Sequence, residues 1–190
     1  MIHVSDKQMR EIIQDHPASN FIVFTHVDAR SPWHPDYLIR KALSIRYMHR
    51  GVTLHTAFSH CGSVWYDKYD EEINYWHLTF PTFIKEPFKF RSYNVFYKVD
   101  DPSTVYGARD HCVRLKQKKK GYGVARLVFY LFTFWHTWFK NPIEVGQVCM
   151  EPVIDGYPRY IKQGKGNADP QSVSLELDKA GLIKYVVDRT

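Results

Sequence analysis

The segment Asn20–Val27 constrains the fold most, because its centre, FIVFT, is a continuous apolar and β-branched run. A run of this kind is typical of a buried strand. Further strand-like segments are His55–Asp67, Ile73–Phe80 and Phe88–Val99, and the polar turn at 67–72 predicts that the first two form a hairpin. The chain therefore needs a sheet with a buried strand in it.

Helical segments are expected between these strands, and residues suited to helix ends mark several of them. Ser5 is suited to cap the first helix, Asp101 or Ser103 a middle one, and Asp169 followed by Pro170 the last. The expected helices cover 5–15, 37–48, 103–116, 124–139 and 169–181, with a short helical turn at 149–156 and a last strand at 183–187. We predict one α+β domain over 20–190, with a central antiparallel sheet flanked by helices, and an N-terminal helical extension at 1–19.

Composition indicates a folded chain that needs no disulfide framework. Aromatic residues make up 16% of the 190 residues, and each ring can bury a large apolar area. The three cysteines are odd in number and show no CxxC spacing, which favours a reduced compartment. The first ten residues lack the apolar core of a signal peptide. The most apolar stretch, 127–135, falls short of the roughly 20 residues that span a bilayer, so no transmembrane segment is expected.

The chain has a formal net charge of +6, and the densest part of its positive charge is one short basic run. Lys116, Lys118, Lys119 and Lys120 precede a Gly-Tyr-Gly sequence, which indicates a solvated loop, with docking of an anion as the alternative. No RNA-binding aromatic motif, helix-turn-helix or zinc finger accompanies the run. Sequence-specific recognition of nucleic acid is therefore not expected.

Cys149 is the candidate nucleophile, because it stands at the start of a predicted helix, where free N–H groups favour a thiolate. A histidine on a neighbouring strand can activate such a sulfur, and His60 is the candidate base. Pairing across the predicted hairpin can bring His77 beside His60 to orient its ring. His60 and Cys61 are adjacent in a strand and should point to opposite faces, so no structural zinc or other cofactor is expected. Cys61 is interpreted as a core residue.

Two motifs around these residues carry a resemblance to a known family. The stretches SHCGSVW (59–65) and CMEPVIDGY (149–157), with histidine before cysteine, resemble the circularly permuted, YiiX-like branch of the NlpC-type papain-like superfamily. Its motifs read roughly S/T-H-V-G-hydrophobic and C-S-E-L-V-x-x-A-Y. His60, Gly62, Cys149, Glu151 and Tyr157 match them, whereas Met150, Pro152 and Gly156 depart. The resemblance covers about residues 20–187 and implies a papain-like fold.

The resemblance implies a thiol hydrolase, a peptidase, amidase or acyl-ester hydrolase, in which Cys149 attacks a peptide, amide or ester carbonyl. His60 would then be the base, His77 would take the place of a polar third member that is often Glu, and the backbone N–H of Cys149 would contribute to the oxyanion hole. A cytoplasmic protein or one carried within a phage or virion is expected. The alternative is a catalytically inactive structural or interaction protein of the same fold, with protein assembly partners.

Overall fold

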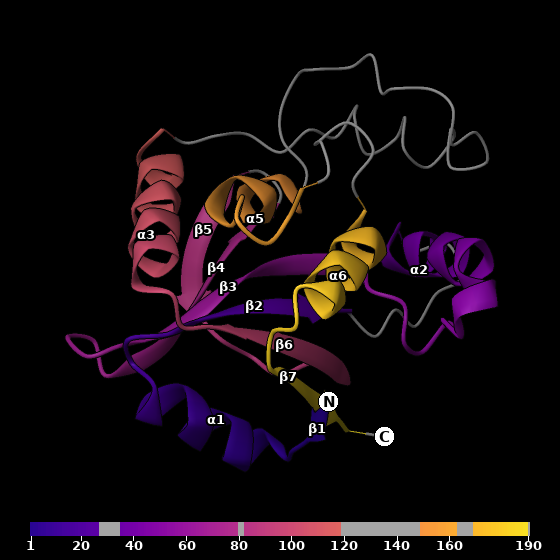
Figure 1. Ribbon diagram of the computed structural model, residues 1–190, viewed down its shortest axis with the longest axis horizontal. Helices are drawn as coiled ribbons and strands as arrows, with labels where there is room; N and C mark the ends of the chain where they lie inside the picture. Colours follow the sequence, from indigo (N-terminus) through magenta and orange to yellow (C-terminus); the bar gives the residue numbers. More distant parts are fainter. Residues whose placement is uncertain (27–34, 80–81, 119–148, 163–168, 190) are drawn as a thin grey trace.

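A seven-stranded sheet with the strand order β1-β7-β6-β2-β3-β4-β5 forms the centre of the computed structural model (Figure 1). The structure describes residues 1–26, 35–79, 82–118, 149–162 and 169–189. Among the described strands, only β1 and β7 pair in parallel. The strands are β1 (Ile2–His3), β2 (Asn20–Thr25), β3 (His60–Asp67), β4 (Glu72–Leu78), β5 (Phe83–Pro87), β6 (Tyr93–Val99) and β7 (Lys184–Asp188). The prediction of an α+β fold around a largely antiparallel sheet is confirmed in this form.

Helices cover both faces of the sheet (Figure 1). Helix α1 lies against one face, and α3, α5 and α6 lie against the other. The helices are α1 (Asp6–Asp15), α2 (Pro35–Arg46), α3 (Pro102–Gln117), α5 (Glu151–Gly156) and α6 (Pro170–Lys179), with a 3₁₀ helix η1 at Met48–Arg50. No helix within the described ranges has the length and apolar character needed to cross a membrane.

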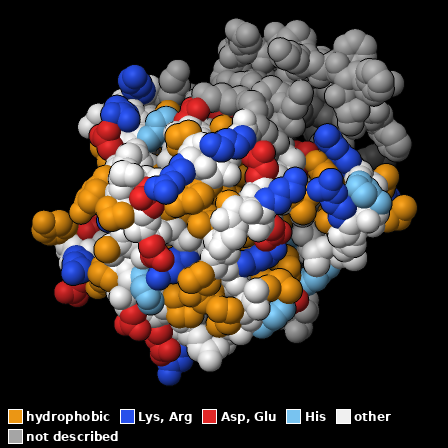
Figure 2. Space-filling model, viewed as in Figure 1, with side chains coloured by type: hydrophobic (Ala, Val, Ile, Leu, Met, Phe, Trp, Pro, Cys, Tyr) orange, Lys and Arg blue, Asp and Glu red, His pale blue; other side chains and the backbone are white. Residues whose placement is uncertain are grey.

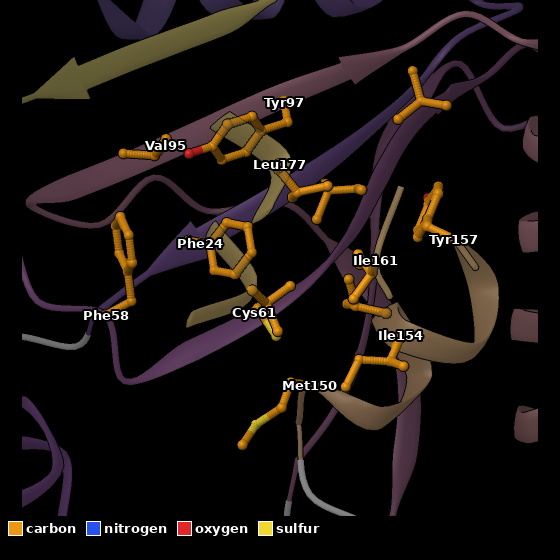
Figure 3. Packing of buried hydrophobic residues seen from close by; sticks show 14 of the residues in the cluster. Phe24, Phe58, Cys61, Val95, Tyr97, Met150, Ile154, Tyr157, Ile161 and Leu177 are labelled. Carbon is orange, nitrogen blue, oxygen red and sulfur yellow. The ribbon is translucent and has the colours of Figure 1, made fainter. Parts of the chain in front are cut away.

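Strand β2 is the buried strand that its composition predicts. It pairs with β3 on one side and β6 on the other, and all six of its residues are buried. Phe21 and Val23 pack into the cluster under α1, whereas Ile22 and Phe24 pack into the cluster under α5 and α6. Figure 3 shows the second cluster, in which Phe24 and Cys61 lie near Met150 at the start of α5. A strand between two covered faces has no solvent side, hence its continuous apolar sequence.

Helix ends agree with the capping signals in the sequence. Ser5 and Asp169 cap α1 and α6, and each of them forms a reciprocal capping box. Asp101 rather than Ser103 caps α3, because its carboxylate accepts the backbone N–H of Thr104. Residues 1–19 contain α1 and β1, and β1 pairs with β7 through Ile2 and His3. The predicted helix at 124–139 lies outside the described residues.

Two predicted strands begin later than expected. Strand β3 begins at His60 rather than His55, because the side chains of Thr53 and Thr56 bond to each other's backbone N–H and hold a turn. Strand β6 begins at Tyr93 rather than Phe88, because the Asn94 amide bonds both the N–H and the C=O of Arg91 and holds a bend. Residues 83–87, which the sequence analysis left unassigned, form the edge strand β5.

Candidate active site

Cys149 lies directly before α5, with Met150 at the N-cap position and Pro152 in the first turn. Its side chain is 5% exposed and belongs to the apolar cluster between the sheet and α5. The sulfur lies 4.0 Å from the carbonyl oxygen of Ser59, the residue that precedes β3. The start of α5 therefore holds the candidate nucleophile against the first residues of β3, where His60 lies.

The surroundings of Cys149 favour its thiolate. A hydrogen bond from the Cys61 side chain, followed by the hydrogen bond and charge of His60, lowers the pKa of Cys149 well below its usual value, despite burial. Burial and the hydrogen bond to Cys149 raise the pKa of Cys61 well above its usual value. Cys61 thus remains a thiol, and its Sγ donates to the carbonyl oxygen of Cys149 at 3.4 Å. The structure thus places the predicted nucleophile against Ser59, the residue that precedes the predicted base His60.

His60, His77 and Glu86 form a chain of hydrogen bonds across three neighbouring strands. His60 Nε2 lies 2.7 Å from His77 Nδ1, and His77 Nε2 lies 3.0 Å from Glu86 Oε1. The three side chains share one face of the sheet, because Val64 pairs with Tyr75, Tyr75 pairs with Glu86, and side chains two residues apart lie on the same side. The hairpin thus brings His77 to His60, as the sequence analysis expected.

The hydrogen-bond chain fixes which ring nitrogens of His60 and His77 carry a proton. Burial, followed by the charges of His60 and Arg91, lowers the pKa of His77 to about 2, so the ring stays neutral although a carboxylate accepts from it. A carboxylate only accepts, so His77 Nε2 carries the proton and Nδ1 accepts from His60 Nε2–H. The nitrogen of His60 that remains for the Cys149 sulfur is Nδ1. In this tautomer Nδ1 carries no proton, so His60 can accept a proton there as a base.

A close approach of β3 and β4 positions the ring of His77. The ring stacks on Tyr75, with centroids 4.0 Å apart and planes 7° apart. A Cβ atom at Gly62 would lie 2.6 Å from Tyr75 Cε2 and 2.8 Å from the Cβ of His77. The absent side chain at Gly62 thus leaves the space that the stacked pair occupies. The glycine of the SHCGSVW motif therefore has a structural role beside the histidine.

Glu86 is the site residue that the sequence analysis missed. It lies on β5, and that strand is short and ends at Pro87, a residue that argues against a strand interior. The alternation of Phe83, Lys85 and Pro87 with Ile84 and Glu86 offers only a weak strand signal. The pairing of Tyr75 with Glu86 across β4 and β5 puts the carboxylate within reach of His77.

The basic run divides at the end of α3. Lys116 belongs to the last turn of α3, and its ammonium group lies 5.7 Å from the centre of the Trp76 ring. Lys118 is the C-cap residue, and Lys119 and Lys120 lie outside the described residues. Figure 2 shows one face of the molecule, on which Lys and Arg side chains are interspersed with Asp and Glu. Docking of an anion by the run stays a prediction.

A cavity of about 320 Å³ lies at the other end of β3 from His60. Pro17, Arg109 and residues 65–69 line it. It is therefore separate from the candidate active site.

Within the described part of the chain, no three His, Cys, Asp or Glu side chains are grouped so that they could hold a metal ion. Comparisons of the chain with family models, with curated proteins and with solved structures found no match.

Proposed function

We propose that this chain is a thiol hydrolase of papain-like fold that cleaves a peptide, amide or acyl ester. The observation that carries the proposal is the chain of hydrogen bonds from His60 through His77 to Glu86, which begins beside the Ser59 carbonyl that Cys149 Sγ contacts at 4.0 Å. The lowered pKa of the Cys149 thiol, to which His60 contributes, agrees with it. A thiolate beside an imidazole is the arrangement that activates a cysteine nucleophile. The motif resemblance supports the same activity and the same residues.

In the proposed mechanism, the Cys149 thiolate adds to the substrate carbonyl carbon and forms a tetrahedral intermediate. The backbone N–H of Cys149 would contribute a hydrogen bond to its oxyanion. His60, protonated at Nδ1, gives that proton to the leaving amine or alcohol as the bond to the leaving group breaks. The thioester that remains is attacked by water, which gives a proton to His60 Nδ1, and the acid leaves with Cys149 restored.

His77 and Glu86 are positioning residues in this mechanism. His77 Nδ1 accepts from His60 Nε2–H and keeps Nδ1 of His60 directed to the sulfur, and Glu86 fixes the proton of His77 at Nε2. A positive charge that develops on His60 is stabilised by this hydrogen bond. The site of action that we propose is the cytoplasm or a phage or virion assembly that carries the protein.

One observation favours a second candidate function, a non-catalytic structural or interaction protein of the same fold. Cys149 is 5% exposed and lies 3.9 Å from the sulfur of Met150, where the family motif has a serine. A buried cysteine among apolar side chains is a common structural residue. The two functions differ in whether the Cys149 sulfur forms a covalent intermediate.

A test of the two functions uses the burst of nitrophenolate from p-nitrophenyl acetate, which reports formation of an acyl-enzyme. We expect a burst proportional to enzyme concentration from the wild-type chain and from Cys112→Ala, and no burst from Cys149→Ala. Cys112 is a matched control because it is also a buried, free cysteine. A wild-type chain without a burst, or a burst that survives Cys149→Ala, contradicts the hydrolase and favours the structural function.

A further inference from the structure

The side chain of Cys61 contacts Cys149. Cys61 Sγ donates a hydrogen bond to the carbonyl oxygen of Cys149 at 3.4 Å, and the interaction of the two side chains lowers the pKa of Cys149. Both cysteines are free, and both belong to the apolar cluster between the sheet and α5. Figure 3 shows Cys61 in this cluster. The two residues are 88 positions apart in the chain, so the fold and not the sequence brings them together.

From this contact we propose that Cys61 and Cys149 form a peroxide-responsive disulfide, with Cys149 as the residue that reacts and Cys61 as the residue that resolves. Redox-sensitive cysteines are typically ionised and lie beside a second thiol. Interactions with the Cys61 side chain and with His60 lower the pKa of Cys149 and so favour its thiolate. A disulfide needs the sulfurs about 2 Å apart, and Cys61 Sγ already lies 3.4 Å from the backbone carbonyl of Cys149.

The reaction takes place in two steps. The Cys149 thiolate attacks one oxygen of a hydroperoxide, the O–O bond breaks, and hydroxide or alkoxide leaves while the sulfur becomes a sulfenic acid. The Cys61 sulfur then attacks the Cys149 sulfur, the S–OH bond breaks, and water leaves with the Cys61 proton. The two sulfurs lose two electrons in total and the peroxide gains them.

The disulfide would occupy the Cys149 sulfur and so block the attack on a carbonyl. This consequence rests on the proposed function, whereas the formation of the disulfide does not. Cys112 provides an internal comparison, since it lies in a separate cluster with Trp65 and Leu115. Burial raises its pKa to about 12, so it is protonated at neutral pH. Peroxide should therefore leave Cys112 as a thiol.

The test treats the folded full-length chain with hydrogen peroxide at pH 7, blocks free thiols with N-ethylmaleimide during denaturation, and maps the peptides by mass spectrometry. We expect a linked peptide pair that contains Cys61 and Cys149, and Cys112 as the maleimide adduct. Dithiothreitol should restore three free thiols. Cys112→Ser should keep the linked pair, and Cys61→Ser should instead give a sulfenic acid at Cys149 that dimedone traps.

Three free thiols after peroxide, a disulfide that includes Cys112, or oxidation of Cys149 beyond the sulfenic acid with Cys61 still free would each overturn the proposal. The wild-type peptide map decides these outcomes even where Cys61→Ser does not fold. A linked pair in a chain without a nitrophenolate burst would support the redox site and contradict the hydrolase. A burst from the reduced chain without a linked pair would support the hydrolase and contradict the redox site.

Discussion

Cys149 and Cys112 are both buried, both free, and have opposite acidities. Cys112 lies on the buried side of α3 among apolar and aromatic side chains, and burial, partly offset by a hydrogen bond with Ser63, raises its pKa to about 12. Cys149 is as deeply buried, yet hydrogen bonds with Cys61 and His60 lower its pKa. Burial by itself opposes the thiolate. The comparison teaches that the donors around a buried cysteine decide whether it can react.

The largest expected effect is the difference in alkylation between these two cysteines. At pH 7, a thiol with a pKa of about 12 is ionised to about 1 part in 10⁵, whereas the pKa of Cys149 lies well below its usual value. Iodoacetamide should therefore label Cys149 several orders of magnitude faster than Cys112, with a pH midpoint for Cys149 below about 8. Peptide mapping against time gives each rate. Equally slow labelling of all three cysteines would remove the distinction between the two regions.

Replacement of the base should have the next largest effect. His60→Ala removes a hydrogen bond and a positive charge that lower the pKa of Cys149, so the pH midpoint of its alkylation should rise. General acid–base catalysis contributes about 10²–10⁴-fold, and the rate of the nitrophenolate burst should fall by that order. Cys112 should label as before, since His60 is not among the groups that affect its pKa.

The matched control for this variant is His55→Ala. His55 is a half-exposed histidine that pairs with Asp188, and it is not among the main groups that shift the pKa of Cys149. It should leave the burst rate and the alkylation midpoint of Cys149 unchanged. If both histidine variants reduce the burst equally, a specific role of His60 is wrong.

The sequence was informative where local chemistry decides structure. The uniform apolar composition of β2, the caps at Ser5 and Asp169 and the helix start after Cys149 each depend on neighbouring residues, and each is found in the structure. The pairing of His77 with His60 also followed from the hairpin, because the turn at 67–72 limits the register of β3 and β4.

Other features depend on pairings that the sequence does not specify. Glu86 reaches His77 because β5 pairs with β4, and no local signal fixes that register. Cys61 was interpreted as a core residue facing away from His60, and it is buried in the core. Its hydrogen bond to Cys149 was not expected, since α5 meets β3 only in the tertiary structure. The later start of β6 depends on the two hydrogen bonds of Asn94, which a strand pattern does not reveal.

Replacement of a glycine by alanine should have opposite effects on the free energy of unfolding in the two regions. Gly62→Ala puts a Cβ atom 2.6 Å from Tyr75 Cε2 and 2.7 Å from the carbonyl oxygen of Trp76, so β3 and β4 must shift beside His77. Overpacking of this kind costs about 1–3 kcal/mol of the free energy of unfolding. Urea unfolding followed by circular dichroism measures the change, and the burst rate should fall as well.

Gly107→Ala is the control on the Cys112 side. Gly107 lies within α3, and a Cβ atom there meets nothing within 4 Å. Alanine favours a helix interior over glycine by about 0.5–1 kcal/mol, so this variant should be slightly more stable than the wild type. A Gly62→Ala chain as stable as the wild type would mean that the contact between β3 and β4 is looser than the structure has it.

The smallest expected effect comes from the end of the hydrogen-bond chain. Glu86→Gln keeps an acceptor for His77 Nε2–H and removes the negative charge. A neutral hydrogen bond in place of a charge-assisted one loses on the order of 1 kcal/mol, which is about fivefold in rate. The Glu86 side chain is 41% exposed, and solvent screening keeps the effect near this size. A change in folding alone would leave the pH midpoint of Cys149 alkylation in place, whereas loss of the charge should raise it.

The matched control is Glu72→Gln. Glu72 is an exposed glutamate at the start of β4, and its replacement should change neither the burst rate nor the alkylation midpoint. If both variants match the wild type in midpoint and burst rate, the site ends at His77, and the acidity of Cys149 relative to Cys112 comes from Cys61 and His60 without help from the third strand.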